Sequence, residues 1–440
     1  MPEETVSNIG GGKQGAPRRL LYFHQHFTTL AGTSGTRSYE FAKALVAKGW
    51  QVTMVCGVAD ASKLGLKPEE GAEAACRPCP VSGVVRGVVD GIHVIALLVP
   101  YSNRDGIARR LLMFVRFALG SARTALLEPC DLVFATSTPL TAAVPGILFK
   151  WLRRKPFVFE VRDLWPELPR AVGLKNPFLL AAMSVLEWLG YHAADALVGL
   201  SPGIVEGIKR RAPKGTPVRM LPNGCDLDIF KPREAARDGD EVKDGALAGI
   251  PGIEPGDFVA GFTGAHGIAN GLDAVLDAAA LALRRGEKRL KFLFVGDGNR
   301  KDSLVERARR ENLENCVFLP PMPKLKLARL TSALDCGLMV LKNVPAFYRG
   351  TSPNKFFDYI AAGIPVLNNY PGWLAEMIEE NRCGVVVPPD SPGAFVEGLL
   401  KLAASPDRNA AMRRAARSLA EREFSRDSLA AGFTEFLAGV

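Results

Sequence analysis

The sequence has few features of a metal-binding, redox-active or secreted protein. Among its eight cysteines, only Cys76 and Cys79 lie close together in sequence, and a four-ligand zinc site needs a second such pair. The chain begins with Pro2, Glu3 and Glu4 and lacks the basic and then apolar start of a signal peptide. We therefore expect reduced, mostly buried cysteines and a cytoplasmic protein.

Long uncharged runs are also scarce. The longest, residues 132–149, approaches the length of a membrane span, but it contains Pro139, Pro145 and several hydroxyl residues. Because proline interrupts helices, we expect this run to form a strand, a turn and a helix. The sequence predicts no membrane-spanning helix.

The chain is long and basic. Its 440 residues predict about two or three domains, each large enough to bury a full core. Lysine and arginine total 55 against 46 acidic residues, which gives a net charge of +9. Such an excess suits nucleic acid, an anionic membrane or a phosphorylated substrate.

Short apolar runs alternate with amphipathic stretches in both halves of the chain. Runs that are apolar on both faces indicate parallel strands covered by helices, and Asp90-Gly91 predicts a hairpin turn. The fold class is therefore α/β, with two Rossmann-like, doubly wound domains facing each other across a cleft. The expected strands are 19–24, 51–57, 131–136, 157–161, 196–201 and 218–224, followed by 257–264, 291–298, 316–320, 335–341, 364–369 and 384–388.

The domain boundaries follow from composition. Residues 231–257 are charged, rich in glycine and proline, and without sustained periodicity, so they form the predicted linker. The first domain is expected at 17–230, after a flexible tail at 1–16, and the second at 258–414. Open α/β sheets bind ligands at the carboxyl ends of their strands, which makes the cleft the predicted active site.

Glycine-containing turns follow three of the expected strands. Exposed backbone N–H groups in such turns suit an anion or a closely approaching substrate. Three turns of this kind favour a nucleotide and its phosphates, although the Gly-x-Gly-x-x-Gly fingerprint is absent. The turns contain Gly32 and Gly35, then Gly264 with His266 at its tip, then Gly296 and Gly298.

Residues 349–367 place a diphosphate-binding pattern at the start of a predicted helix. Ser352 is expected to cap this helix, and Pro353 suits its first turn. The amides of residues 353–355, Asn354 included, would then point into the cleft beside Lys355 and Arg349. A leaving diphosphate fits this combination of helix dipole and cations.

Asp358 lies one turn beyond Lys355 on the same helix face. A carboxylate at this position could accept hydrogen bonds from both hydroxyls of a ribose. An ordinary surface ion pair between these two residues is the alternative interpretation of the spacing.

With these motifs, the chain resembles the retaining glycosyltransferases of family four, which have the GT-B fold. The resemblance spans nearly all of residues 18–435, and residues 350–366 match the end of the family's donor-site signature, Glu-x(7)-Glu followed by small residues and Gly-x-Pro. Asp358 matches the second acid of that signature. Gly350 stands where the first, sugar-contacting glutamate is expected.

A second departure concerns the turn 264–271. The family usually holds the donor diphosphate there with an arginine and a lysine, whereas this chain has Ala265, His266 and Asn270. Lys355 is our candidate to replace the missing charge.

Four short segments resemble the branch of the family that transfers N-acetylated, often deoxy, amino sugars in bacterial surface-polysaccharide assembly. The resemblance implies a UDP-sugar donor, a polyprenyl-diphosphate-linked sugar acceptor, and neither a cofactor nor a metal. It also implies a donor site that includes Met322 and a terminal helix at 415–440 that returns to the first domain. The four segments are 24–27, 161–167, 222–226 and 352–359.

Asp163 is the candidate group for orienting or deprotonating the acceptor hydroxyl. It follows the strand 157–161, where related enzymes keep a histidine and an acid, and Arg162 and Glu167 are its neighbours. A buried aspartate that caps the turn is the alternative.

Histidines and a second pair of acids provide further candidates. His24 and His26 alternate across a strand end, so at most one faces the cleft, and we assign His24 a catalytic role with a packed histidine as the alternative. Asp226 and Asp228 match an Asp-x-Asp metal motif, but they are expected to end a turn before the linker, so no metal is predicted.

The positive charge concentrates in the first domain. Residues 101–160 contain nine basic and four acidic residues, and residues 107–127 form a basic amphipathic helix, followed by a second basic segment at 150–156. This pattern favours peripheral binding to the anionic inner face of the cell membrane. A protein partner or inward packing of the apolar side are alternatives, and no nucleic-acid-binding motif accompanies the charge.

Two other functions fit a chain of this kind. A GT-B-fold UDP-N-acetylhexosamine epimerase would need acids and histidines in the cleft but no lipid acceptor. A non-catalytic nucleotide-sugar-binding scaffold would explain the glycine at position 350.

Overall fold

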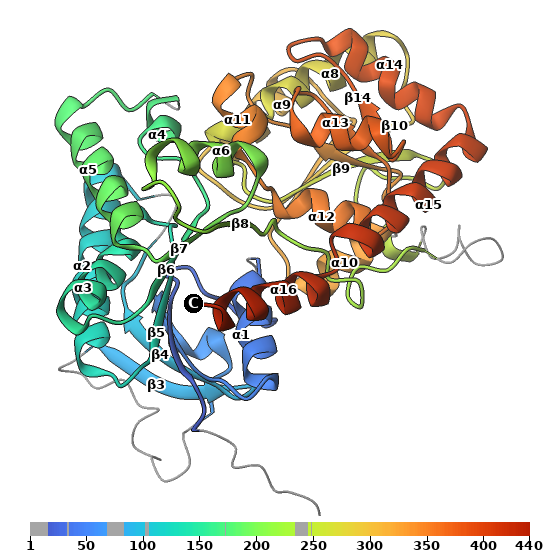
Figure 1. The fold of residues 1–440 in the computed structure, drawn as a ribbon. Helices are drawn as coiled ribbons and strands as arrows, with labels where there is room; N and C mark the ends of the chain where they lie inside the picture. Colours follow the sequence, from blue (N-terminus) through green and yellow to red (C-terminus); the bar gives the residue numbers. More distant parts are fainter. Residues whose placement is uncertain are drawn as a thin grey trace, which may run out of the picture.

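A computed structural model gives the arrangement of two α/β domains (Figure 1). The tail at 1–15, the Cys76–Cys79 pair and most of the expected linker lie outside the described residues. The described residues are 16–32, 35–67, 83–101, 105–171, 173–233, 245–247 and 249–440.

The first domain is built on an eight-stranded sheet of order β3-β4-β2-β1-β5-β6-β7-β8. All neighbouring strands are parallel except β3 and β4, which form the predicted hairpin through Asp90 and Gly91, both with positive φ. The strands are β1 (Arg19–Phe23), β2 (Gln51–Val58), β3 (Val84–Val89), β4 (Ile92–Leu98), β5 (Leu132–Thr136), β6 (Phe157–Val161), β7 (Ala196–Gly199) and β8 (Val218–Met220).

Helices cover both faces of this sheet. On one face, α2, α3 and α5 pack on a core that includes Phe117, Phe149 and Tyr191 (Figure 1). On the other face, α1 packs beside the last helix of the chain, α16. The helices of this part are α1 (Arg37–Ala47), α2 (Ile107–Leu127), α3 (Ala143–Arg153), α4 (Glu167–Ala171), α5 (Pro177–Ala193) and α6 (Pro202–Arg211), with 3-10 turns η1 (Ala61–Leu64) and η2 (Leu140–Ala142).

The second domain is built on six parallel strands in the order β11-β10-β9-β12-β13-β14. Its strands are nearly all apolar because helices bury both faces of the sheet. The strands are β9 (Phe258–Thr263), β10 (Leu290–Val295), β11 (Cys316–Leu319), β12 (Cys336–Met339), β13 (Val366–Asn368) and β14 (Gly384–Val386).

Two groups of helices sandwich the second sheet. One face is covered by α8, α9 and α14, and the other by α10, α11, α12, α13 and α15. The prediction of two doubly wound domains is thus confirmed. The elements are η3 (Ile268–Asn270), α8 (Asp273–Arg284), α9 (Lys301–Arg310), α10 (Lys324–Ala333), α11 (Pro345–Gly350), α12 (Asn354–Ala361), α13 (Trp373–Glu380), α14 (Pro392–Ala403) and α15 (Pro406–Glu423).

The end of the chain differs from the single terminal helix expected at 415–440. α15 ends at Glu423, and α16 (Arg426–Ala438) begins after a short connection. Phe424 packs in the core of the second domain, whereas Phe433 stacks on Phe41 in the first domain with ring centres 4.6 Å apart. Apolar side chains in two different cores hold the two helices in place, so the chain crosses between the domains at the connection.

The described part of the chain contains no helix whose length and apolar character would let it cross a membrane.

Candidate active site at the domain interface

The two glycine turns of the second domain are docked directly on each other. A Cβ atom at Gly296 would lie 1.9 Å from the carbonyl oxygen of Gly264, and one at Gly298 would lie 2.5 Å from that of His266. The N–H of His266 donates to the carbonyl of Asp297 at 2.9 Å. Glycine is therefore required at 296 and 298 for the close approach of the turns that follow β9 and β10.

His266 does not lie at the tip of its turn, as the sequence suggested, but is fully buried. Its ring packs among Phe262, Phe294 and Phe318, and neither ring nitrogen has a hydrogen-bond partner. Burial, and then the charges of Lys301 and Lys355, lower its pKa to about 4. Aromatic packing therefore makes His266 a neutral anchor beneath the turn, and its ring is not presented to a ligand.

Lys355 reaches from α12 to the first of these turns. Its Nζ donates to Oδ1 of Asn270 at 2.8 Å and lies 3.9 Å from the centre of the Phe262 ring. A Cβ atom at Gly264 would lie 3.3 Å from Cε of Lys355. The structure thus places the lysine at the turn where the arginine and lysine of the family are missing.

The environment of Lys355 disfavours its charge. Burial lowers the pKa of its ammonium group to about 7, and none of its described neighbours supplies a carboxylate partner. An anion bound at this turn would restore the missing electrostatic partner and favour the protonated form.

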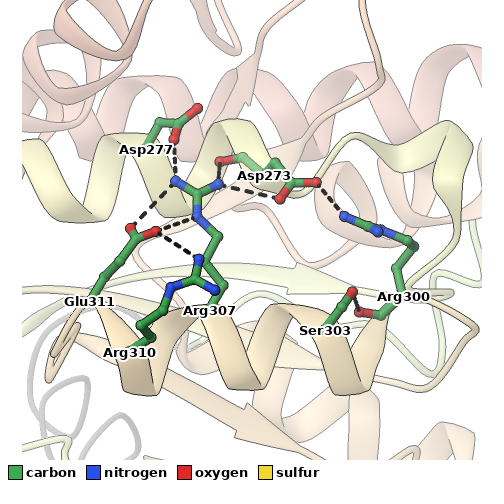
Figure 2. Close-up of polar contacts among 7 residues, drawn as sticks. All are labelled: Asp273, Asp277, Arg300, Ser303, Arg307, Arg310 and Glu311. Carbon is green, nitrogen blue, oxygen red and sulfur yellow. Dashed lines mark hydrogen bonds and ion pairs between the residues drawn. The ribbon is translucent and has the colours of Figure 1, made fainter.

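An ion-pair network joins α8 to α9 and to Arg300 just before it (Figure 2). Arg307 of α9 binds Asp273 at 3.3 Å and also pairs with Asp277 of α8. Arg300 binds Asp273 at 3.1 Å through its side chain and donates its backbone N–H to the carbonyl of His266 at 3.0 Å. The network therefore fixes the start of α9 relative to the turn that precedes α8.

Lys301 is a positioning residue that the sequence analysis missed. Its Nζ donates to the carbonyl oxygens of Gly296 at 2.7 Å and Leu319 at 2.9 Å. This links the turn after β10 to the end of β11, close to Met322, which is half-buried in the following loop. In the sequence, the only signal for this lysine is its position three residues after Gly298. A lysine at such a position is common at helix starts.

The start of α12 differs from the expected serine-capped helix. α12 begins at Asn354, no side chain caps it, and Ser352 instead binds the first domain. Oγ of Ser352 accepts from the N–H of Asn223 at 3.1 Å, and its carbonyl accepts from Nδ2 of Asn223 at 2.5 Å. Asn223 competes for the serine, so Ser352 and Pro353 form part of the domain contact.

The first-domain turn at Gly35 meets the second domain at the same place. A Cβ atom at Gly35 would lie 2.7 Å from Nδ2 of Asn354. Gly32 is packed against its own turn, because a Cβ atom there would lie 1.9 Å from Oγ1 of Thr28. Two motifs that were predicted from opposite halves of the sequence therefore converge at the start of α12.

Asp358 lies on α12 near a cluster of charges at the domain contact. Burial raises the pKa of its carboxyl to about 7, with Lys324 and Arg426 opposing the shift and Asp226 adding to it. Asp226 accepts from Nε of Arg426 at 2.7 Å and pairs with Lys324, and Lys324 also donates to Oγ1 of Thr36 at 2.5 Å. The first acid of the Asp-x-Asp motif is therefore engaged by two cations.

Arg349 is oriented differently from the sequence-based expectation. It belongs to α11, which ends at Gly350, and its Nη1 lies 3.5 Å from Glu376 of α13 at an exposed position. Its carbonyl oxygen accepts from Oγ of Ser201 in the first domain at 2.8 Å. Because a separate helix carries Arg349, its guanidinium group faces α13, and only its backbone reaches across the domain interface.

The first domain contributes His24, Arg162 and Asp163 at the ends of β1 and β6. His24 is buried, with Nδ1 2.7 Å from Oγ of Ser38 and Nε2 3.5 Å from Nη1 of Arg162. Burial lowers its pKa well below the usual value, and Arg162 lowers it further. His24 is therefore neutral and lies against Arg162.

The Asp163 carboxyl is partly exposed, and burial raises its pKa while Arg162 opposes the shift. Within the described ranges it forms no ion pair or hydrogen bond. Glu167 is different, because it pairs with Arg211, which also binds Glu187 at 2.7 Å. Asp163 thus keeps a carboxylate available for a ligand, whereas Glu167 is held in a network within the first domain.

One cavity of the second domain lies away from these residues. It has a volume of about 540 Å³ and is bordered by Asp273, Asp277 and Arg300 of the network in Figure 2, together with Asn343 and Ser391. None of the site residues expected from the sequence lines it. This cavity is therefore separate from the residues that the sequence predicted for the site.

Comparison with known proteins supports the same division of the chain. Residues 32–224 match the family model of a glycosyl transferase 4-like domain, and residues 257–405 match that of glycosyl transferases group 1. The probable glycosyltransferase WbjE of Pseudomonas aeruginosa is 26% identical over 308 residues, which cover 67% of this chain and 72% of WbjE. A glycogen synthase of Thermus thermophilus is 26% identical over 73% of this chain and 76% of its own length.

Solved structures share the fold. Sucrose-phosphate synthase of Thermosynechococcus elongatus has a TM-score of 0.71 at 16% identity, covering 96% of this chain and 98% of that one. HepE of Anabaena in complex with UDP-glucose has a TM-score of 0.66 at 15% identity, covering 96% and 100%. WaaG, a glycosyltransferase involved in lipopolysaccharide biosynthesis, has a TM-score of 0.67 at 17% identity, with the same coverage. The two matched domains and the two facing sheets show that this chain belongs to the GT-B glycosyltransferases of the family-four type.

Proposed function

We propose that the chain transfers a sugar, with retention of configuration, from a UDP-sugar to a polyprenyl-diphosphate-linked saccharide during assembly of a bacterial surface polysaccharide. The observation that carries this proposal is the position of Lys355 over the glycine turn at Gly264. A half-buried lysine without a carboxylate partner suits the diphosphate of a nucleotide-sugar. The UDP-glucose complex of HepE and the involvement of WaaG in lipopolysaccharide biosynthesis support this choice of donor and pathway class.

In this proposal the chain's own residues divide the work between donor and acceptor. Lys355 stabilises charge on the departing diphosphate, and Asp358 accepts hydrogen bonds from the ribose hydroxyls. Asp163 orients the acceptor hydroxyl, while the departing phosphate oxygen takes up its proton in a front-face displacement. Neither a cofactor nor a metal takes part, and Asp226, the best metal-ligand candidate by sequence, is paired with two cations.

Gly350 supports an N-acetylated amino sugar as the transferred group. A Cβ atom at this position would meet no atom within 4 Å, so the structure has open space where the family carries a glutamate. The missing carboxylate removes a hydrogen-bond acceptor for sugar hydroxyls and leaves room for a bulkier substituent.

The surface of the first domain supports a membrane-bound acceptor. Large apolar side chains are more than half exposed on α2, α3 and α5, which lie next to one another on one face of the sheet. We define the apolar face as these residues: Leu119, Leu127, Trp151, Leu152, Phe178, Val185 and Trp188. α5 was not part of the sequence-based prediction, because it carries little positive charge.

Exposed arginines accompany the apolar face. Arg109, Arg116 and Arg123 lie on α2, and Arg154 follows α3. Apolar side chains that enter the interface, together with cations that meet anionic headgroups, are the combination expected for peripheral binding. We therefore propose that the enzyme works on the cytoplasmic side of the cell membrane with this face against the bilayer.

A donor and acceptor screen tests the proposal. The protein is incubated with UDP-N-acetylhexosamines and with UDP-glucose, with and without a polyprenyl-diphosphate-sugar, while UDP release and product masses are measured. Transfer that requires the lipid acceptor and favours the N-acetylated donor is the expected result. Epimerisation without acceptor would identify an isomerase, and binding without turnover would identify a scaffold.

A further inference from the structure

Two arginines, Arg110 and Arg162, lie near the carboxyl edge of the first sheet. Arg110, in the first turns of α2, places its guanidinium carbon 5.7 Å from the centre of the Tyr101 ring. Tyr101 in turn packs between His26 at 4.9 Å and Phe114 at 5.5 Å. The Tyr101 ring therefore lies against the guanidinium group of Arg110.

Arg162 faces the same group of rings from the end of β6. Both guanidinium groups act on His26, whose pKa is lowered to about 4 by burial and then by Arg162 and Arg110. The 3.5 Å contact between Arg162 and Nε2 of His24 shows where the guanidinium group is held. Because a guanidinium group only donates, Nε2 is the unprotonated nitrogen and Nδ1–H faces Ser38.

These two half-buried arginines have guanidinium groups that no carboxylate of the described residues occupies. Along the described part of the chain, neither guanidinium group forms an ion pair with a carboxylate, and Nε of Arg110 is buried without any hydrogen-bond partner. Two acids lie near these arginines. Asp105 lies 3.7 Å from Arg109, a different arginine of α2. Asp163 interacts electrostatically with Arg162 but forms no ion pair with it. Two guanidinium groups that form no ion pair with the described residues, at the carboxyl edge of the sheet, are suited to a phosphate.

We propose that Arg110 and Arg162 bind the diphosphate of the lipid-linked acceptor. This inference rests on the proposed function and specifies how the acceptor is held. The position on α2 agrees with it, because the outward side of the same helix carries Leu119 and Leu127 of the apolar face. The lipid chain would remain in the bilayer beside α2 while its diphosphate is bound at the first turns of that helix.

His24 has a positioning role in this arrangement. Its neutral ring directs a lone pair at Arg162 and thereby helps to hold the guanidinium group in place. Loss of the imidazole is expected to weaken binding of the acceptor diphosphate without changing the affinity for UDP.

The test uses equilibrium binding and does not depend on turnover. Geranyl diphosphate is titrated into the full-length protein with saturating UDP, so that the diphosphate site at Lys355 is occupied, and geraniol and inorganic pyrophosphate are titrated in parallel. Arg110→Gln and Arg162→Gln are each expected to weaken geranyl diphosphate binding by about 10-fold or more, since a charge-assisted hydrogen bond contributes about 1.5–3 kcal/mol. Arg116→Gln, on the outward side of α2, is the matched control and should bind as the wild type does.

Vesicles of phosphatidylglycerol separate this site from the membrane surface. Arg116→Gln should weaken vesicle binding, and Arg110→Gln should leave it unchanged. The proposal is overturned if Arg110→Gln and Arg162→Gln bind geranyl diphosphate normally, if geraniol binds as tightly as its diphosphate, or if Arg110→Gln impairs vesicle binding as much as it impairs ligand binding. A failure of sugar transfer with every acceptor would instead count against the proposed function.

Discussion

Nζ of Lys355 donates to Oδ1 of Asn270 at 2.8 Å, so a residue from the donor-signature helix occupies the turn where the family's own lysine is replaced. The hydrogen bond joins two segments of the second domain that are 85 positions apart in sequence. Lys355 and Asn270 therefore meet at the turn that we propose for the donor diphosphate.

Replacing Lys355 is expected to impair catalysis and not folding. Lys355→Ala should lower kcat by about 100-fold or more, because loss of one stabilising donor at a developing anion has an effect of that size. Steady-state UDP release measures the change, and thermal unfolding provides the control. Near-normal turnover of a well-folded variant would refute the assignment.

The affinity for UDP should be greatest near pH 7. The pKa of Lys355 in the free protein is about 7, against an ordinary value of 10.5, so at higher pH the bound diphosphate must recruit a proton and binding weakens by up to about tenfold per pH unit. The pKa of Asp358 is also about 7, so at lower pH ribose binding to the carboxylate must release a proton.

Two variants show which residue causes the fall in UDP affinity on each side of pH 7. The affinity for UDP is measured by calorimetric titration from pH 5.5 to 9. In Lys355→Met it should no longer fall above pH 7, and in Asp358→Asn it should no longer fall below pH 7. The lysine also affects stability: between pH 7 and 10.5 the unfolded chain binds more protons, so its contribution to the free energy of unfolding rises with pH in that window. If the affinity of both variants still fell above and below pH 7, the proposed roles of Lys355 and Asp358 would be contradicted.

The Asp163→Asn variant tests whether Asp163 is a catalytic carboxylate or a structural cap of the turn. Burial raises the pKa of this group, and it has no ion pair that the amide would break. The free energy of unfolding at pH 8 should therefore not fall, whereas kcat for acceptor transfer should drop by about 100-fold. A lower melting temperature with unchanged kcat would instead identify the structural cap.

Gly350→Glu should change the donor preference. The space around this position accommodates a side chain, and the restored carboxylate would accept hydrogen bonds from hexose hydroxyls. The ratio of kcat/KM for UDP-N-acetylglucosamine to that for UDP-glucose is expected to fall by about 10-fold or more. Gly350→Gln, of similar volume, is the control for steric effects, and an unchanged ratio in Gly350→Glu would show that this position does not set specificity.

The apolar face predicts membrane binding that depends on α5. Phe178 is 85% exposed, and burying such a side chain in the bilayer contributes about 2 kcal/mol, or about 30-fold in affinity. Phe178→Ser should therefore release the protein from phosphatidylglycerol vesicles in flotation assays without altering UDP binding. Leu325→Ser, at an exposed position on α10 of the second domain, is the matched control, and equal effects of both changes would argue against a specific face.

The sequence predicted the sheets well because their strands are buried on both faces and therefore stand out as apolar runs. Every expected run contains a strand, and the turn at Asp90-Gly91 lies where expected. Local chemistry was sufficient for these features, since each depends on residues that are neighbours in the chain.

Features that depend on distant residues could not be predicted in this way. Ser352 has the sequence of a helix cap but binds Asn223 of the other domain, and His266 has the sequence of a loop tip but is buried among rings from three strands. Arg349 is separated from Lys355 by a helix boundary at Gly350. In each case a tertiary partner outweighs the local preference.

The crossing of the chain at Phe424 also has a consequence for synthesis. The core of the first domain includes Ala430, Phe433 and Leu437 of α16, which the ribosome adds only after the whole second domain. The first domain therefore cannot complete its core during translation, while the second domain already has all its strands. The half of the enzyme that is translated first therefore needs the last helix of the chain to complete its core.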